Sequence, residues 1–590
     1  MKVLLAFVGL LLACATLAVA QGYEGPARLE IAAGPLALVL DVAPDGLKHT
    51  YTATDSRSGQ VWEAQGGNDT GFILQAEKTS PASLRLLFRH CQTESRFWCA
   101  VSLSAEGALS FTIEAEDPQA DFAWLNYPPV FHATLAEGAL LFCDRSSGAL
   151  IPQSDETYRG KTLMCYGNTN ALDQPFVGMV DLSTGAGCAL LLETPCDVVV
   201  RFEPDADSKS WPRVIWISSL GKLASPRTVS YRFSPEGGYV ALAKLYQDWA
   251  ARQGQIVPLT ERAKTRPRLD WLAGACLVWG SDGLRFAEEA RARGVARAIV
   301  YGRFPPEELR KLTDLAFLTG EYDNYVDLLE GPPGITRGNI EKESYRAPDG
   351  KARTGWLTLE GLQYYQRSSS QSVAAAEAYV PDLLAKWPFT LRFIDVSPAV
   401  DLVEDYHPDH TFDRRQDADY RRELLSWMQQ KGLVVGGEHA KAWTQPYVDY
   451  AEGTMSGSFW WEYDAGHLVR IKNRDQFPSR YLDYGINPQV RIPLYELLYH
   501  DCLVSTWYWG DSSGYAYDIA PELSDFKDIS NILYGTPPLM WANELGYGWD
   551  RERQRFLQTY RLTCKWHEAV AFTQMEHHEF LSEEIGRAHV

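Results

Sequence analysis

The chain has 590 residues, of which 45% are apolar and 12% aromatic, and its formal net charge at pH 7 is −20. This much apolar material can form the cores of two or three domains. Binding to a phosphate backbone requires clustered Lys and Arg that displace counterions, so the acidic charge balance argues against nucleic acid as a partner. The 19 Trp and 30 Tyr residues suit either aromatic cores or flat platforms for ligands.

The first 20 residues have the pattern of a secretory signal peptide. One lysine precedes an apolar run that ends in the small residues Ala18 and Ala20. We therefore expect a secreted or periplasmic protein. Residues 11–14 also resemble a bacterial lipoprotein box in which Cys14 would carry the lipid, so a lipoprotein is the alternative. After residue 20 no apolar run approaches the roughly 20 residues that a membrane span requires.

The cysteine count and the C-terminal residues carry two further expectations. Ten cysteines become nine if Cys14 is removed with the signal, and an odd number cannot pair completely within one chain. Six of them lie in the first third, where an exported protein could form disulfides. The last six residues, IGRAHV, match a translated sequencing adapter, so we expect 571–590 to contain the start of a missing β domain and an artefactual tail.

The apolar pattern changes along the chain and divides it into domains. Over 21–240, short alternating runs separated by Gly, Pro, Asp and Ser predict an antiparallel β-sandwich. Residues 241–265 hold a helix and a charged, proline-containing linker. Over 266–570, eight strand-like runs alternate with helical stretches, which predicts a TIM-like (β/α)8 barrel, with a doubly wound open sheet as the alternative.

The strand and helix assignments in the predicted barrel are specific. The eight strand-like runs are 275–280, 297–303, 315–325, 391–396, 433–439, 457–463, 503–511 and 538–544. Helices are expected at 282–294, 375–387 and 417–432.

Two neighbouring strands of the predicted barrel end in acids, Asp395 and Glu438. Residues at the carboxyl ends of barrel strands converge on one mouth, and consecutive strands lie about 5 Å apart. The two carboxyl groups can therefore face the same substrate atom. The other acids at predicted strand ends are Glu321, Asp323, Asp327, Glu462, Asp464, Asp511 and Glu544.

Such a pair suits a retaining glycosidase, which needs one carboxylate to attack the anomeric carbon and one acid to protonate the leaving oxygen. Asp395 is short and suited to attack, and Glu438 has the longer reach that proton transfer needs. Trp443, Trp460 and Trp461 could supply apolar surroundings that raise the pKa of the acid. The alternative is that either acid caps a helix or pairs with an arginine.

Four segments resemble glycoside hydrolase family 129 and the related family 101: 321–327, 393–410, 436–453 and, most distinctively, 491–513. The resemblance implies a retaining enzyme that acts on α-linked N-acetylgalactosamine, or on Gal-GalNAc, in mucin-type O-glycans. It also implies a β-sandwich followed by a catalytic barrel and further β domains. Carried onto this sequence, it makes Asp395 the nucleophile and Glu438 the acid/base, which agrees with the argument from the strand ends.

The resemblance adds candidate substrate-binding residues. An acid in 321–327 is expected to hold sugar hydroxyls, and Asp323 is preferred over Asp327. At the seventh strand a tryptophan could stack on a sugar ring, with barrel packing as the alternative. The full set of substrate-binding candidates is Asp323, Asp327, His500, Trp507, Trp509 and Asp511, of which His500 has a structural role as its alternative.

This mechanism requires no cofactor, although acids at a barrel mouth could hold Ca2+. Tyr322 stands where family members often have His, and no tryptophan-bearing lid of the endo-acting enzymes is identified in the sequence, although Trp356 is a faint candidate. Both features leave the choice between exo and endo action open. The competing hypotheses are an inactive carbohydrate-binding protein on the same scaffold and a barrel α-glycosidase of other specificity.

Overall fold

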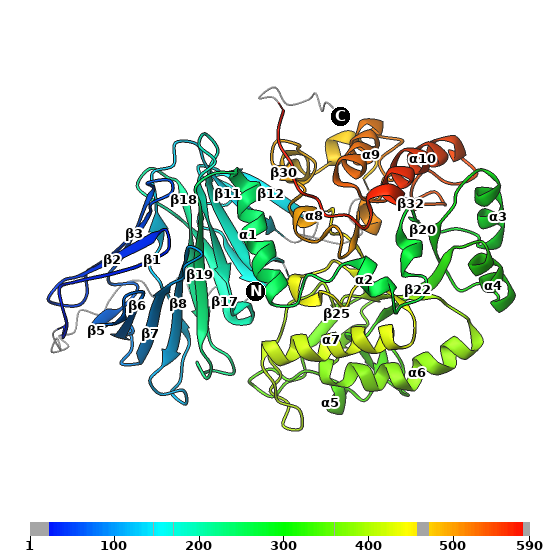
Figure 1. The fold of residues 1–590 in the computed structure, drawn as a ribbon. Coiled ribbons are helices and arrows are strands. Elements are labelled where there is room, and N and C mark those ends of the chain that lie inside the picture. The colour runs from blue at the N-terminus through cyan, green and yellow to red at the C-terminus, as the bar shows by residue number, and fades with distance from the viewer. Residues whose placement is uncertain (1–22, 145–146, 169, 359, 457–470, 582–590) are drawn as a thin grey trace.

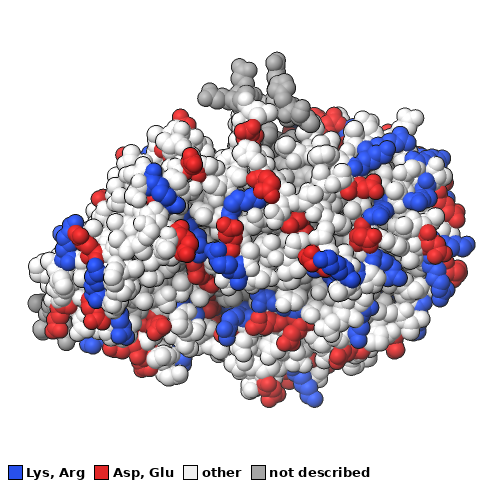
Figure 2. All heavy atoms as spheres, in the orientation of Figure 1, with Lys and Arg blue, Asp and Glu red and all other residues white. Residues whose placement is uncertain are grey.

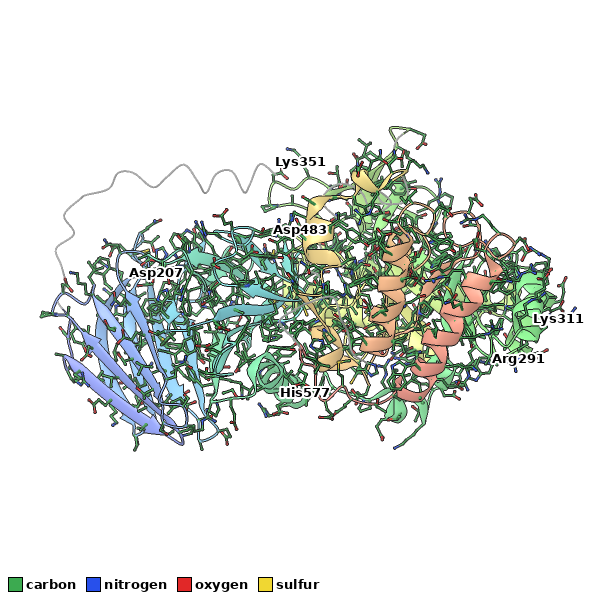
Figure 3. The ribbon with its side chains drawn as sticks, turned by 90° about the horizontal axis from the view of Figure 1, so that it is seen from above. Asp207, Arg291, Lys311, Lys351, Asp483 and His577 are labelled. Atoms are coloured by element: carbon green, nitrogen blue, oxygen red, sulfur yellow. The ribbon has the colours of Figure 1, made fainter. Side chains whose placement is uncertain are left out.

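The computed structural model describes residues 23–581 except 145–146, 169, 359 and 457–470 (Figure 1). The expected signal peptide, Cys14, the predicted sixth strand with Trp460, Trp461, Glu462 and Asp464, and the IGRAHV tail lie outside the described residues. The described chain forms a β-rich N-terminal part and an α/β C-terminal part, which lie side by side in Figures 1 and 3. In Figure 3, Asp207 marks the β-rich part, and Arg291 and Lys311 lie at the far end of the other.

The N-terminal part is a sandwich of two β-sheets. A five-stranded sheet has the order β1 (Arg28–Ala33), β2 (Leu36–Val42), β3 (His49–Asp55), β4 (Val61–Gly66) and β10 (Phe131–His132). The other sheet has fifteen strands, namely β5 (Phe72–Ser80), β6 (Ser83–Arg89), β7 (Arg96–Leu103), β8 (Ala108–Ala115), β9 (Trp124–Leu125), β11 (Gly138–Asp144), β12 (Ser147–Pro152), β13 (Thr162–Cys165), β14 (Ala171–Leu172), β15 (Phe176–Asp181), β16 (Gly187–Leu192), β17 (Val198–Pro204), β18 (Ser210–Ile217), β19 (Arg227–Ser234) and β30 (Arg491–Ile492).

The sandwich forms because alternate residues of its strands are apolar and face inward. In β2, Leu36, Leu38 and Leu40 are buried while the residues between them are more exposed. Rings meet between the sheets, as where Tyr51 of β3 packs edge-on against Phe111 of β8 with centroids 5.4 Å apart. The predicted antiparallel sandwich is confirmed.

The C-terminal part is built on a sheet of eight parallel strands. Their order is β31 (Val504–Thr506), β29 (Tyr450–Glu452), β28 (Val434–Glu438), β27 (Leu391–Asp395), β22 (Leu318–Asn324), β21 (Ala298–Tyr301), β20 (Cys276–Trp279) and β32 (Leu539–Trp541). Strands that are neighbours in the sheet are also consecutive barrel strands along the chain. The first barrel strand, β20, pairs with the eighth, β32, so the sheet curls into a nearly closed barrel. The barrel prediction is confirmed, and the doubly wound alternative is wrong.

One strand was predicted at the wrong place. The sixth strand of the barrel is β29, Tyr450–Glu452, which pairs with β28 on one side and β31 on the other. The prediction of 457–463 followed the longer apolar and aromatic run. A three-residue strand that follows Asp449 and ends in Glu452 has too short an apolar pattern to stand out.

Helices surround the barrel and join it to the sandwich. They are α1 (Gly238–Arg252), α2 (Leu259–Ala263), α3 (Leu284–Ala292), α4 (Pro306–Asp314), α5 (Ile340–Glu343), α6 (Ser372–Lys386), α7 (Arg414–Gln430), α8 (Leu494–Tyr499), α9 (Pro521–Tyr534) and α10 (Arg553–Val570). The helices predicted at 282–294, 375–387 and 417–432 correspond to α3, α6 and α7. A capping box formed by Asp413 and Gln416 starts α7, slightly before the predicted position.

Two further features position the site. After the third barrel strand the chain forms a small sheet of β23 (Asp327–Glu330), β24 (Arg337–Gly338), β25 (Thr354–Leu357) and β26 (Gln363–Gln366). Inside the barrel, Trp279 stacks on Tyr301 with centroids 3.9 Å apart, and Phe393 and Tyr450 complete an aromatic layer. This layer closes the barrel below its mouth.

Three observations concern the described chain as a whole. The nine cysteines of the described residues are all free thiols, so the disulfides that export would permit are not formed among them. Among the described helices, none combines the length and apolar character of a membrane span. Exposed ion pairs such as Arg285–Asp550 and Arg551–Asp518 belong to a surface on which charges of both signs are interspersed (Figure 2).

Candidate active site

Asp395 and Glu438 meet at the mouth of the barrel. They are the last residues of the adjacent parallel strands β27 and β28, and their side chains are hydrogen-bonded to each other. Glu438 is 7% exposed. The structure thus brings together the two acids that the sequence placed at adjacent strand ends.

The turns after both strands are left-handed at residues other than glycine. Val396 has φ of 62° and His439 has φ of 52°. A β-branched residue in this region is strained, and such strain persists where the surroundings enforce it. At Val396 the turn directs the backbone N–H to Oε2 of Glu438 at 2.9 Å, so the turn after one acid holds the other.

Tyr508 provides a second contact to Glu438. Its hydroxyl donates to Oε1 at 3.3 Å, and its ring is buried. The two oxygens of Glu438 are thus held by groups that follow two different strands, β27 and β31. This arrangement fixes the direction in which the carboxyl group points.

The electrostatic surroundings keep a proton on the pair. Burial raises the pKa of Asp395 well above its usual range, and Glu438, Asp327 and Glu452 raise it further. Two carboxyl groups in contact cannot both ionise at neutral pH without a large cost. The pair therefore shares one proton at neutral pH, and a retaining reaction requires that proton on Glu438 when Asp395 attacks.

Asp327 lies beside the catalytic pair. It begins β23, and Asn324 donates its amide to Oδ2 at 2.9 Å. Burial raises the pKa of Asp327; the hydrogen bond from Asn324 lowers it, and the charge of Glu438 raises it. Its position near Glu438 makes it available to hold sugar hydroxyls at the mouth.

Asp323, which the sequence favoured over Asp327, is placed differently. It is fully buried and its carboxylate accepts from the guanidinium of Arg392, at 2.8 Å from Nε, and from the hydroxyl of Tyr325 at 3.2 Å. Its neighbour Tyr322 is 58% exposed. Alternation along β22 therefore turns Asp323 away from the side that Tyr322 faces, and the geometry reverses the order of preference in favour of Asp327.

The two tryptophan candidates of the seventh strand also differ in where their side chains lie. Trp507 is fully buried, donates to Asn531 at 2.9 Å and packs under Arg491. Its role is packing. Trp509 is half-buried and lies edge-on to Trp541, next to the aromatic layer inside the barrel, so it is the tryptophan of the two that lies toward the mouth.

Asp511 and His500 are held in structural contacts. Asp511 is fully buried and accepts from Lys527, from Tyr481 at 3.0 Å and from Ser456 at 2.8 Å. The two ring nitrogens of His500 lie 2.7 and 3.0 Å from main-chain carbonyl oxygens of Thr573 and Gly535. The structure does not bring either residue to the catalytic pair.

Sequence reasoning missed two residues of the site, Tyr508 and Glu452. Val504 faces the barrel interior, so the period of two along 504–508 directs Tyr508 inward and Trp507 outward. Glu452 ends the short sixth strand and is the register partner of Glu438. Correct placement of that strand would have revealed it.

The described residues contain no group of three or more His, Cys, Asp and Glu side chains arranged to hold a metal ion. The acids at the mouth, a hydrogen-bonded pair with Asp327 and Glu452 as neighbours, do not form such a group, whereas Ca2+ takes six to eight oxygen ligands. No step is assigned to a metal.

A (β/α)8 barrel with two adjoining carboxyl groups at its mouth is the arrangement of a glycoside hydrolase. The family model described as "Glycosyl hydrolases related to GH101 family, GH129" matches residues 298–586. The resemblance that the four segments indicated is confirmed by this match.

Solved structures support the fold over nearly the whole chain. The chain is similar to the α-N-acetylgalactosaminidase NagBb from Bifidobacterium bifidum in complex with GalNAc, with a TM-score of 0.73, 15% identity and 94% of each chain covered. It is more distantly similar to a family 31 sulfoquinovosidase from E. rectale, with a TM-score of 0.52, 10% identity, and 92% of this chain and 84% of that one covered. No curated protein sequence matches the chain.

Proposed function

We propose that the protein is a retaining glycoside hydrolase that releases α-linked N-acetylgalactosamine, or Gal-GalNAc, from mucin-type O-glycans. The observation that carries the proposal is the contact between Asp395 and Glu438 at adjacent strand ends. The match to the family 129 model supports it, as does similarity to a solved α-N-acetylgalactosaminidase bound to GalNAc. The N-terminal 20 residues support export, either to the periplasm or outside the cell, with lipid attachment at Cys14 as the alternative.

The reaction proceeds by double displacement. The carboxylate of Asp395 attacks the anomeric carbon while Glu438 gives its proton to the glycosidic oxygen, so that the leaving group departs as an alcohol. Glu438, now a carboxylate, takes a proton from water, and the resulting oxygen attacks the same carbon and releases Asp395. Both the net charge and the proton count of the pair return to their starting values, so the mechanism needs no cofactor.

The surrounding groups orient this chemistry. The N–H of Val396 and the hydroxyl of Tyr508 hold Glu438 in one direction, and Asp327 faces the same space. Prepositioned groups of this kind lower the barrier because little reorganisation is needed during the reaction.

A panel of aryl α- and β-glycosides tests the function. Release from aryl α-GalNAc or aryl Gal-GalNAc with retention is expected, and the sugar that is released separates exo from endo action. Release from another α-glycoside alone would assign a different specificity. No release from any member of the panel, together with binding of glycans, would assign an inactive carbohydrate-binding protein.

Variants of the pair test the assigned roles. Asp395→Ala should abolish turnover. Glu438→Ala should lose far more on a poor leaving group than on an activated one, because only the poor one needs the proton. Glu544→Ala is the control, since this exposed acid follows the eighth strand and should leave both rates unchanged. Equal losses on both leaving groups would remove the acid role from Glu438.

A further inference from the structure

A third acid lies directly beside the catalytic pair. Glu452 is the last residue of β29, and it is the register partner of Glu438 across the parallel ladder. The backbone N–H of His439 donates to the carbonyl oxygen of Glu452 at 2.7 Å. Asp395, Glu438 and Glu452 therefore end three consecutive barrel strands, and the third of them has no place in the mechanism above.

The side chain of Glu452 is enclosed by aromatic residues. It is fully buried, and Nε1 of Trp279 donates to Oε1 at 3.0 Å. Trp279 stacks on Tyr301, whose hydroxyl donates to Tyr450 at 2.8 Å. Among the described residues, the other carboxyl oxygen of Glu452, Oε2, is buried and has no hydrogen-bond partner. A negative charge on this oxygen would be uncompensated, whereas a neutral carboxyl group still accepts from Trp279 through Oε1 and carries no charge.

The charges around Glu452 favour the same neutral form. From the neighbouring strands it faces Glu438 and, one strand further, Asp395, both of them acids. Among the described residues, Glu452 forms no ion pair with Lys, Arg or His. Burial raises the pKa of Glu452 to about 8; the hydrogen bond from Trp279 lowers it, and the charge of Glu438 raises it. A buried carboxylate without a cation is costly, so the proton is retained.

We propose that Glu452 is a positioning residue that acts as a neutral carboxylic acid: it holds Trp279 beside Glu438 and stops supporting turnover once it ionises. The expected loss of turnover rests on the proposed function, whereas the protonation of Glu452 does not. After ionisation the group is a buried carboxylate beside Glu438, and in this aromatic enclosure it must draw in water. This change loosens the packing next to Asp395 and Glu438.

The test compares Glu452→Gln, which imitates the neutral acid, with Glu452→Ala, which removes the contacts. At pH 7 the Gln variant should keep kcat/KM for an aryl α-GalNAc glycoside within about threefold, and the Ala variant should lose about 100-fold, the size of effect that small misplacement of catalytic groups produces. Above pH 8 the wild type should lose turnover while Glu452→Gln retains it to higher pH.

Infrared spectroscopy of the protein without substrate measures the protonation directly. The wild type should show a protonated carboxyl band that disappears between pH 7 and 9, and Glu452→Gln should lack it. Glu496→Gln is the matched control, because Glu496 is a buried acid on α8 whose pKa burial raises to about 7. This control should keep both the alkaline band and the alkaline fall in turnover.

The outcomes separate this inference from the proposed function. If the infrared band is present and assigned to Glu452 but no glycoside is cleaved, the proposed function fails and the neutral acid stands. If Glu452→Gln keeps the band, or if its turnover falls with pH in the same way as the wild type, the inference is overturned even though the enzyme is active.

Discussion

A buried lysine connects the sandwich to both catalytic strand ends, and its removal can be predicted in magnitude. Lys441 follows Glu438 by three residues and is fully buried. Its ammonium donates to Oδ1 of Asp173, in the sandwich, at 3.2 Å and to the carbonyl oxygen of Ala399, in the turn after Asp395. The carboxylate of Asp173 is also fully buried, so Lys441→Met leaves a buried charge without its cation.

Breaking a buried ion pair by removing one partner costs about 3–5 kcal/mol, whereas removing both partners costs much less. Lys441→Met should therefore lower the free energy of unfolding by about 4 kcal/mol, and the double variant Asp173→Leu, Lys441→Met should recover most of this loss. Turnover should fall by about 100-fold in the single variant, because the turns that carry Asp395 and Glu438 lose a shared tie.

Urea unfolding at pH 7 and kcat/KM on an aryl glycoside measure the two effects. Lys264→Met is the control, since Lys264 forms an exposed pair with Glu261 that should contribute at most about 1 kcal/mol. If Lys441→Met costs no more than this control, or if the double variant is as unstable as the single one, the ion pair does not join the two parts as described.

Three further predictions concern the site. Tyr508→Phe removes the hydroxyl that donates to Glu438, and kcat/KM on a poor leaving group should fall about tenfold, more than on an activated one; equal falls would contradict the orienting role. Asp327→Asn should lower kcat/KM with little change in stability, whereas Asp323→Asn should mainly lower the free energy of unfolding; the opposite pattern in urea and kinetic data would restore Asp323 as the binding acid. The pKa of Glu452 is raised in the folded protein, so its protonation stabilises the fold below the pKa that the group has in the unfolded chain, and this stabilisation is lost as pH rises to about 8. In urea unfolding, Glu452→Gln should therefore be more stable than the wild type at pH 8 by up to about 5 kcal/mol. Parallel pH dependences of the free energy of unfolding in the two proteins would contradict this.

The sequence predicted the catalytic pair because two strong signals coincided there. Residues 391–395 and 433–438 are apolar runs that end in acids, and both become strands of the expected direction in adjacent positions. For a parallel barrel, order along the chain is order in space, so proximity follows once the strands are recognised.

Whether each remaining candidate reaches the site depends on which way its side chain points. The sequence does not place the end of a strand to the residue, and a shift by one residue turns each side chain to the opposite face. Tyr322 and Asp323 are adjacent, as are Trp507 and Tyr508, yet in each pair one residue faces the barrel mouth or interior and the other does not. The direction of each side chain can be predicted only when one residue of the strand is known to face inward, as Val504 is.

Long-range partners were beyond the local pattern altogether. Asp511 is neutralised by Lys527 of α9, and Asp173 by Lys441 from the other part of the molecule. Nothing in the residues around either acid indicates these cations, because an ion pair between distant segments leaves no periodicity in the sequence.

Azide rescue tests most directly whether Asp395 attacks the sugar and Glu438 transfers the proton. With an activated aryl α-glycoside, Glu438→Ala in the presence of azide should form the α-glycosyl azide, since azide replaces water in the second displacement. Asp395→Ala should form the β-glycosyl azide, since azide attacks in place of the carboxylate. Proton NMR of the two products distinguishes the anomers. The same anomer from both variants, or undiminished hydrolysis by either one without azide, would contradict the assignment.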